Sequence, residues 1–115
     1  MTSAPHGASE SLADEPFFEA LVARSRRTNI ARVEQLAQLV ASCRKTRRAD
    51  QTQVSRLAEL AHQVVGSAGT FGFGQVSDLG RDFEHVLVRS TEPTVADLME
   101  LDQLAAAMLM DLQSV

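Results

Sequence analysis

The 115-residue chain is long enough for one domain with a hydrophobic core and too short to divide into two. Its formal net charge of −4 argues against general binding to nucleic acids, which requires a basic face. A single cysteine, Cys43, excludes an internal disulfide framework and a metal site built on paired thiolates. With no signal-peptide pattern and no long apolar run, we expect a soluble cytoplasmic protein.

The N-terminal end of the chain has the composition of an unstructured segment. Residues 1–13 are small and polar, and they have too few apolar side chains to offset the entropy of ordering them. We therefore predict a flexible tail over residues 1–13 and one helical domain over residues 14–115. His6 lies in this tail, and we assign it no ligand role.

The first predicted helix begins at Pro16, because proline suits the first helical position and the acidic residues before it complement the helix dipole. Its apolar stripe consists of Phe18, Val22, Val33, Leu36 and Val40. Ser25 and Asn29 interrupt this stripe. Two arrangements therefore stay open: one long helix to about Lys45, or two helices with a break near the segment SRRTN.

A basic segment, RKTRRAD (residues 44–50), closes this first helical region. Cations near a helix C-terminus are stabilising, and runs of charge are usually solvated. We interpret these side chains as surface charges. A role in orienting an anionic partner is the alternative.

The second predicted helix opens at Asp50, which forms a capping pair with Gln53, and it ends or turns at the glycines from Gly72 to Gly74. Its predicted buried face consists of Val54, Leu57, Ala58, Ala61, Val65 and Ala68.

Two more amphipathic helices follow, separated by the loop STEPT. Their apolar stripes are Val76, Leu79, Phe83, Val86 and Leu87 in the third helix, and Val95, Leu98, Leu101, Leu104 or Ala105, Met108 and Leu112 in the fourth. Thr94 with Asp97 indicates a capping box for the last helix. No segment alternates with the period of a strand. The predicted fold is all-α: an antiparallel four-helix bundle with an additional N-terminal helical segment.

His62 stands out because a helical wheel places it off the apolar face of the second helix. Ser55 and Glu59 precede it on the same side, and Gly66 and Gly69 continue that side toward the C-terminus. Glycine costs roughly 1 kcal/mol relative to alanine inside a helix, so its use beside His62 indicates a need for space. A bulky partner could reach the imidazole from there.

Other chemistries that use histidine fit the sequence poorly. His85 falls opposite the apolar stripe of its helix, beside Asp82 and Glu84, which predicts a surface residue; neither His62 nor His85 belongs to a zinc-binding pair. No G-x-S-x-G nucleophile motif is present. The glycine run lacks the lysine of a phosphate-binding loop and follows a helix instead of a strand. We expect no metal or cofactor bound by this chain.

The stretch AHQVVGSAGTFGF (residues 61–73) resembles the signature of histidine-containing phosphotransfer (HPt) domains, commonly A-H-x-L-K-G-S-A-G-x-x-G. The matching residues are Ala61, His62, Gly66, Ser67, Ala68, Gly69 and Gly72. The segment LGRDFE in the third helix is similar to a leucine-rich family segment with an acidic end. The resemblance covers residues 15–112.

The resemblance implies that His62 accepts a phosphoryl group from an aspartyl phosphate on one response-regulator receiver domain and passes it to another. It implies a phosphocarrier, not an autonomous kinase. The partners would be receiver domains and a hybrid sensor histidine kinase, with Mg²⁺ held by the receiver. Gly66, Gln63, Ser67 and Gly69 would provide the phosphate environment and docking clearance. We expect the domain to be a monomer.

One position departs from the family pattern. The usual lysine three residues after the histidine is Val65 here, which cannot neutralise a phosphate. Gln63 and Ser67 are the nearest polar residues in sequence, and residues 44–48 are a further source of charge if the fold brings them close.

The missing lysine keeps a second hypothesis open. In it, the chain is a non-transferring HPt-like adaptor or inhibitor that binds a receiver or a kinase. A third hypothesis is a helical bundle of unrelated purpose, for which the glycine run and the exposed histidine are a coincidence.

Overall fold

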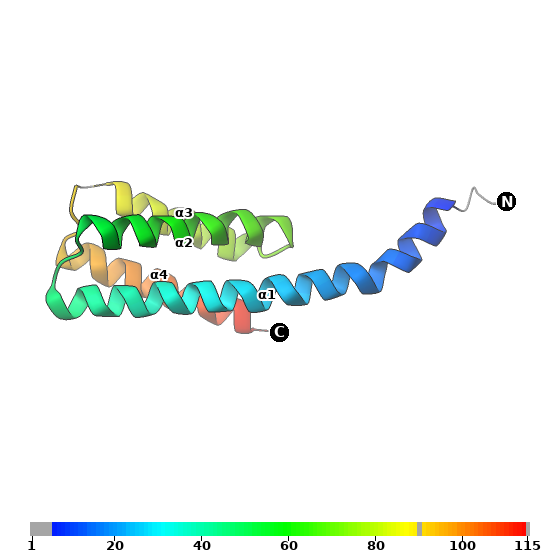
Figure 1. Ribbon diagram of the computed structural model, residues 1–115, viewed down its shortest axis with the longest axis horizontal. Helices are drawn as coiled ribbons and strands as arrows, with labels where there is room; N and C mark the ends of the chain where they lie inside the picture. Colours follow the sequence, from blue (N-terminus) through cyan, green and yellow to red (C-terminus); the bar gives the residue numbers. More distant parts are fainter. Residues whose placement is uncertain (1–5, 90, 115) are drawn as a thin grey trace.

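Four helices make up the regular structure of the described residues, which are 6–89 and 91–114, with side chains described from Glu15 onward. In this computed structural model they are α1 (His6–Thr46), α2 (Gln51–Thr70), α3 (Gly74–Val88) and α4 (Val95–Gln113). Consecutive helices run antiparallel; α1 packs on α2 and α4, and α3 packs on the same pair (Figure 1). The predicted all-α four-helix bundle is confirmed. None of these helices has the length and hydrophobicity that crossing a membrane requires.

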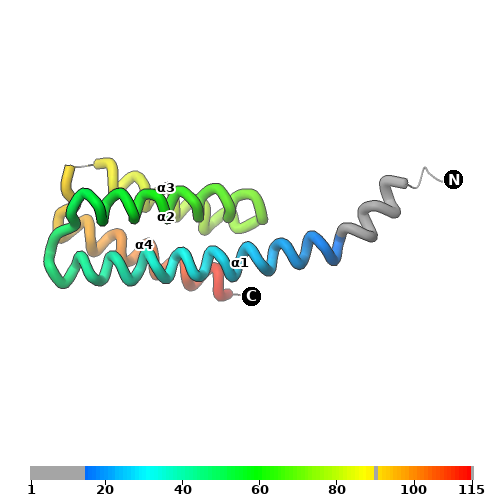
Figure 2. Tube along the Cα trace, in the orientation of Figure 1, coloured from blue at the N-terminus to red at the C-terminus, as the bar shows by residue number. Residues whose placement is uncertain are grey.

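The longest helix, α1, extends past the rest of the bundle at its N-terminal end (Figure 2). The predicted start at Pro16 is wrong, because α1 begins at His6 and carries Pro16 inside it. The proline ring holds φ near the helical value, but an interior proline loses one backbone hydrogen bond and crowds the carbonyl group four residues earlier, at a cost of about 3 kcal/mol. The expected additional N-terminal segment is thus the first part of α1. Residues 1–5 lie outside the described residues, and the flexibility of the tail stays a prediction.

No break occurs near Ser25 and Asn29, because both side chains face α2 and find partners there. Ser25 Oγ lies 3.1 Å from Ser67 Oγ. The Asn29 side-chain amide donates to Ser25 Oγ at 3.3 Å and to Ser67 Oγ at 3.2 Å. Asn29 is fully buried, and hydrogen bonding offsets most of the cost of burying its polar atoms. The chain therefore adopts the one-helix arrangement, and the interruption of the apolar stripe marks a polar contact between helices.

α2 begins as predicted, with a reciprocal capping box formed by Asp50 and Gln53. Its buried face is rotated from the predicted one. The buried residues are Leu57, Leu60, Ala61, Val64 and Ala68, whereas Val54, Ala58 and Val65 are only partly buried. The rotation arises because α2 packs on both α1 and α3. The residues that are buried most deeply are therefore those that point between these two helices. The rotation also turns His62 further from the core.

α2 and α3 approach each other closely at Gly80. A Cβ atom placed on Gly80 would lie 2.7 Å from Val65 Cγ2 and 3.9 Å from the Ala61 carbonyl oxygen. One turn earlier on α3, Ser77 Oγ donates to the Val65 carbonyl oxygen at 3.1 Å. The connecting turn contains Gly72 with a φ of +90°, a conformation that other residues rarely adopt. These contacts set the register of the two helices.

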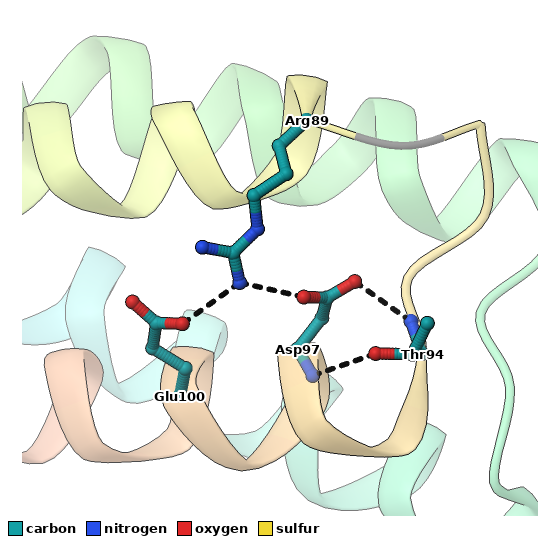
Figure 3. A network of polar contacts seen from close by, with 4 residues as sticks. All are labelled: Arg89, Thr94, Asp97 and Glu100. Carbon is teal, nitrogen blue, oxygen red and sulfur yellow. Dashed lines mark hydrogen bonds and ion pairs between the residues drawn. The ribbon is translucent and has the colours of Figure 1, made fainter.

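Arg89 at the end of α3 is linked to the first two turns of α4 (Figure 3). Its guanidinium donates to Asp97 Oδ1 at 2.6 Å and to Glu100 Oε1 at 2.8 Å. The predicted capping box is present: the Thr94 N–H donates to Asp97 Oδ2 at 2.9 Å, and the Asp97 N–H donates to Thr94 Oγ1 at 3.0 Å. The hydrogen bond from the Thr94 backbone, followed by the one from Arg89, holds the pKa of Asp97 below its ordinary value.

Substitution at Gly80 tests the contact between α2 and α3. We expect Gly80→Ala to lower the free energy of unfolding by about 1–3 kcal/mol, because the new methyl group would overlap Val65. Gly66→Ala is the matched control: a Cβ there meets nothing within 4 Å, so helix propensity should stabilise the fold by about 0.5–1 kcal/mol. Urea denaturation followed by circular dichroism measures both changes. Shifts of the same sign in the two variants would contradict the close approach.

The Asp97 carboxylate should make stability depend on pH at the acidic end. Folding lowers the pKa of Asp97. Its contribution to the free energy of unfolding is therefore complete above the unfolded-state pKa of about 4, and it is lost as the pH falls through the lower folded-state pKa. Asp97→Asn should therefore be about 1–2 kcal/mol less stable at neutral pH, and the difference should close in that acidic window.

Denaturation of wild type and Asp97→Asn at a series of pH values measures this difference. Asp102→Asn is the control, because Asp102 pairs with Arg44 at the exposed surface and such pairs contribute about 0–1 kcal/mol. A difference for Asp97→Asn that persists unchanged in acid would rule out a role for the ionised carboxylate.

Candidate functional site

His62 lies near the middle of α2 with 83% of its side chain exposed, in agreement with the predicted position off the core. Its Nδ1 is 3.3 Å from Oε2 of Glu84, a residue of α3. Glu84 is less exposed, at 31% of its side chain, so the carboxylate lies against the bundle and the imidazole stands outside it. The histidine thus leans toward α3, and the register set at Gly80 determines which residue of α3 it meets.

This contact selects one form of the imidazole. A proton on Nδ1 can be donated to the Glu84 carboxylate, which favours the tautomer with an unprotonated Nε2. Among the described residues, Nε2 has no hydrogen-bond partner. The arrangement therefore presents a nucleophilic nitrogen to the solvent while the opposite nitrogen is held by a carboxylate.

The two glycines expected to provide clearance have different surroundings. Gly66, one turn after His62, is exposed, and a Cβ atom placed there would meet nothing within 4 Å. A Cβ on Gly69 would lie 3.3 Å from Ser77 Oγ, so this position is tightened by α3. Gly66 leaves the surface beside the imidazole open, whereas Gly69 mainly accommodates the neighbouring helix.

The polar residues Gln63 and Ser67 lie on the other flank of α2, toward α1. Ser67 Oγ is occupied by the hydrogen bonds with Ser25 and Asn29. Gln63 and Ser67 line an open cavity of about 330 Å³ between the two helices, to which Arg24 and Arg32 of α1 also contribute. The structure thus separates the expected site residues into two groups, with His62 and Gly66 apart from the α1 flank. Their assignment to the phosphate environment stays a prediction.

The basic segment at residues 44–48 lies far from His62. Two hydrogen bonds between α1 and α2 show which part of α1 lies opposite His62. Asn29 bonds with Ser67 and Gln35 bonds with Arg56, so the α1 residues opposite His62 lie between Asn29 and Gln35. Arg32 falls between these two residues, and Arg44 is twelve residues further along, or about 18 Å in a helix. Arg44 also pairs with Asp102 at 2.8 Å. This segment does not supply charge to the imidazole in this fold.

Glu84 is the residue that sequence reasoning missed. The sequence places it beside His85 and at the acidic end of the segment LGRDFE, but it does not pair it with His62, which lies 22 positions away. Helical periodicity shows which residues of one helix share a face, but not which residue of the next helix stands opposite. His85 itself is exposed, in agreement with its interpretation as a surface residue.

A family model, the Hpt domain, matches residues 20–114, which is most of the chain. The chain belongs to the Hpt domain family. Hpt domains are helical phosphocarrier modules of two-component signalling and are not kinases, so a phosphotransfer-type role in such signalling follows for this Hpt domain. Family members act with receiver domains and kinases. No significant match was found among curated proteins or among solved structures.

Proposed function

We propose that this Hpt domain shuttles a phosphoryl group between receiver-domain aspartates through a phosphohistidine at His62. The observation that carries the proposal is the surface at the middle of α2: an exposed imidazole whose Nδ1 meets Glu84, next to the open surface over Gly66. A hybrid sensor kinase would supply the first receiver and a response regulator the second, both in the cytoplasm.

The chemistry requires little from this chain. Nε2 of His62 attacks the phosphorus of an aspartyl phosphate in line with the bond to the carboxylate oxygen; the N–P bond forms, the P–O bond breaks, and the aspartate leaves as a carboxylate. The reverse reaction delivers the group to a second aspartate. Glu84 accepts a hydrogen bond from Nδ1–H and offsets the positive charge that the ring gains. The receiver contributes Mg²⁺, and this chain binds no cofactor.

We assign to Arg81 the role of the lysine that is missing at position 65, which is to supply positive charge to the phosphoryl group. Arg81 precedes Glu84 by three residues, so both side chains lie on one side of α3, and it follows Gly80, which contacts Val65 of α2. Arg81 therefore stands beside the turn of α2 that follows His62. Its ion pair with Asp78, at 2.9 Å, is exposed on both sides and contributes about 0–1 kcal/mol, so the guanidinium is able to turn to a phosphoryl group.

One observation favours the alternative function. The Val65 side chain packs against Gly80 of α3, where a lysine would carry charge to the surface. An Hpt domain that binds receivers without accepting phosphate would act as an adaptor or inhibitor, and the labelling experiment below separates the two functions.

Incubation with a panel of ³²P-labelled phosphorylated receiver domains tests the role of His62. Wild type should take up label that is stable in alkali and lost in acid, as expected for a phosphoramidate. His62→Gln should take up none, and His85→Gln, which changes a second exposed histidine, should be labelled like wild type. Wild-type protein that binds the receivers but never becomes labelled would establish the adaptor function instead.

Substitution of Arg81 tests the source of positive charge. In Arg81→Gln the yield of phosphohistidine or the transfer rate should fall by about three- to tenfold, because a charge-assisted hydrogen bond to the phosphoryl group is lost. Arg24→Gln is the control, since it removes the same charge from the α1 flank. Equal effects of the two substitutions would show that only net charge matters, and labelling of wild type with no effect of Arg81→Gln would refute this assignment alone.

A further inference from the structure

The N-terminal part of α1 has a face that no other helix covers. Arg44 of α1 pairs with Asp102 of α4, and α4 ends at Gln113, eleven residues further on. Because the two helices are antiparallel, α4 reaches only to about the level of Val33 on α1. The part of α1 whose side chains are described continues to Glu15, beyond the end of α4 (Figure 2). This leaves an uncovered strip along roughly five turns of helix.

A shallow groove of about 360 Å³ runs along this strip. It is lined by Phe18, Glu19, Val22, Ala23, Arg26 and Arg27. Phe18 remains 54% exposed although its ring meets that of Phe71, with centroids 6.5 Å apart. Glu15 lies one turn before Glu19 on the same side. The centre of the strip is therefore apolar, and its small residue, Ala23, allows another helix to approach closely.

The charges of the strip are ordered along the helix. Two carboxylates, Glu15 and Glu19, stand at its N-terminal end, and two guanidinium groups, Arg26 and Arg27, stand at its C-terminal end. Within the described part of the chain none of these four forms an ion pair; the Arg26 guanidinium lies over the Phe73 ring, 5.4 Å from its centroid, whereas Arg27 is exposed. A strip of this kind is complementary to itself when two copies are placed antiparallel, because each acidic end then faces a basic end.

We infer that the strip of residues 15–27 pairs with the same strip of a second copy of this chain, antiparallel about a twofold axis near Val22 and Ala23. Glu19 of each copy then faces the exposed Arg27 of the other, and the apolar centres pack together. The partner helix runs in the direction of α4 and fills the space beyond its end. The contact is isologous, so it closes on itself as a dimer.

Pairing at this strip leaves His62 accessible. Ala23 and Arg27 are each two residues from Ser25, which faces α2, so they lie about 160° around the helix from that contact. His62 leans toward α3, and among the described residues α1 packs on α2 and α4 without touching α3. The inferred interface and the phosphotransfer site are on different flanks of the molecule. The inference therefore holds or fails independently of the proposed function.

Charge reversal with sedimentation velocity over a range of protein concentrations tests the dimer. Wild type should show a monomer–dimer equilibrium. Glu19→Arg and Arg27→Glu should each raise the dissociation constant by about tenfold or more, because like charges then face each other. An equimolar mixture of the two variants should dimerise again, since Arg at 19 of one chain meets Glu at 27 of the other, and so should the chain that carries both changes.

Arg24→Glu is the matched control, because it makes the same change in charge on the flank of α1 that faces α2. It should leave the dissociation constant unchanged, and circular dichroism of every variant verifies that the bundle is folded. A wild type that stays monomeric at all concentrations would overturn the inference. So would a dimer that is weakened equally by Arg24→Glu, or one that the mixture of variants fails to restore.

Discussion

The close approach of α2 and α3 at Gly80 is the constraint on which the site depends. The absence of a side chain there lets Val65 and the Ala61 carbonyl group come against the backbone of α3. With the helices at this distance, the Ser77 hydroxyl reaches the Val65 carbonyl oxygen, and Glu84, two turns along, reaches His62. The orientation of an exposed imidazole is thus determined by a contact made inside the bundle, where packing is tight and leaves little freedom.

The opposite flank of α2, which faces α1, is held by hydrogen bonds instead of apolar packing. Ser25, Asn29 and Ser67 form a small hydrogen-bonded group, and Arg32 adds a contact to the Asn29 side-chain oxygen at 3.2 Å. A shift of α1 by one turn would leave these polar atoms buried without partners, and an unpaired buried polar group costs more than its hydrogen bond contributes in place. Apolar packing on one side and polar matching on the other together leave α2 a single position in the bundle.

Local pattern predicted the helices, both capping boxes and the exposure of His62, because each depends on residues within a few turns of one another. The predicted start of α1 is wrong because the fixed φ of Pro16 is helical whether the residue stands first or inside the helix. The contacts between helices could not be predicted from the periodicity of each helix alone. Ser67 follows His62 by five residues and is expected beside the phosphate, yet its hydroxyl faces α1. Glu84 does meet the histidine, and only the register of α2 against α3 reveals it.

The contact between Val65 and Gly80 has a consequence for variation of this domain. The two positions share one volume, so the size of the residue at one limits the size at the other. A change at position 65 that restores a long cationic side chain would empty the space over Gly80, and the vacated surface would then accept a larger residue on α3. The apolar residue beside the histidine and the glycine fifteen positions later form one steric unit, and we expect them to vary together among related domains.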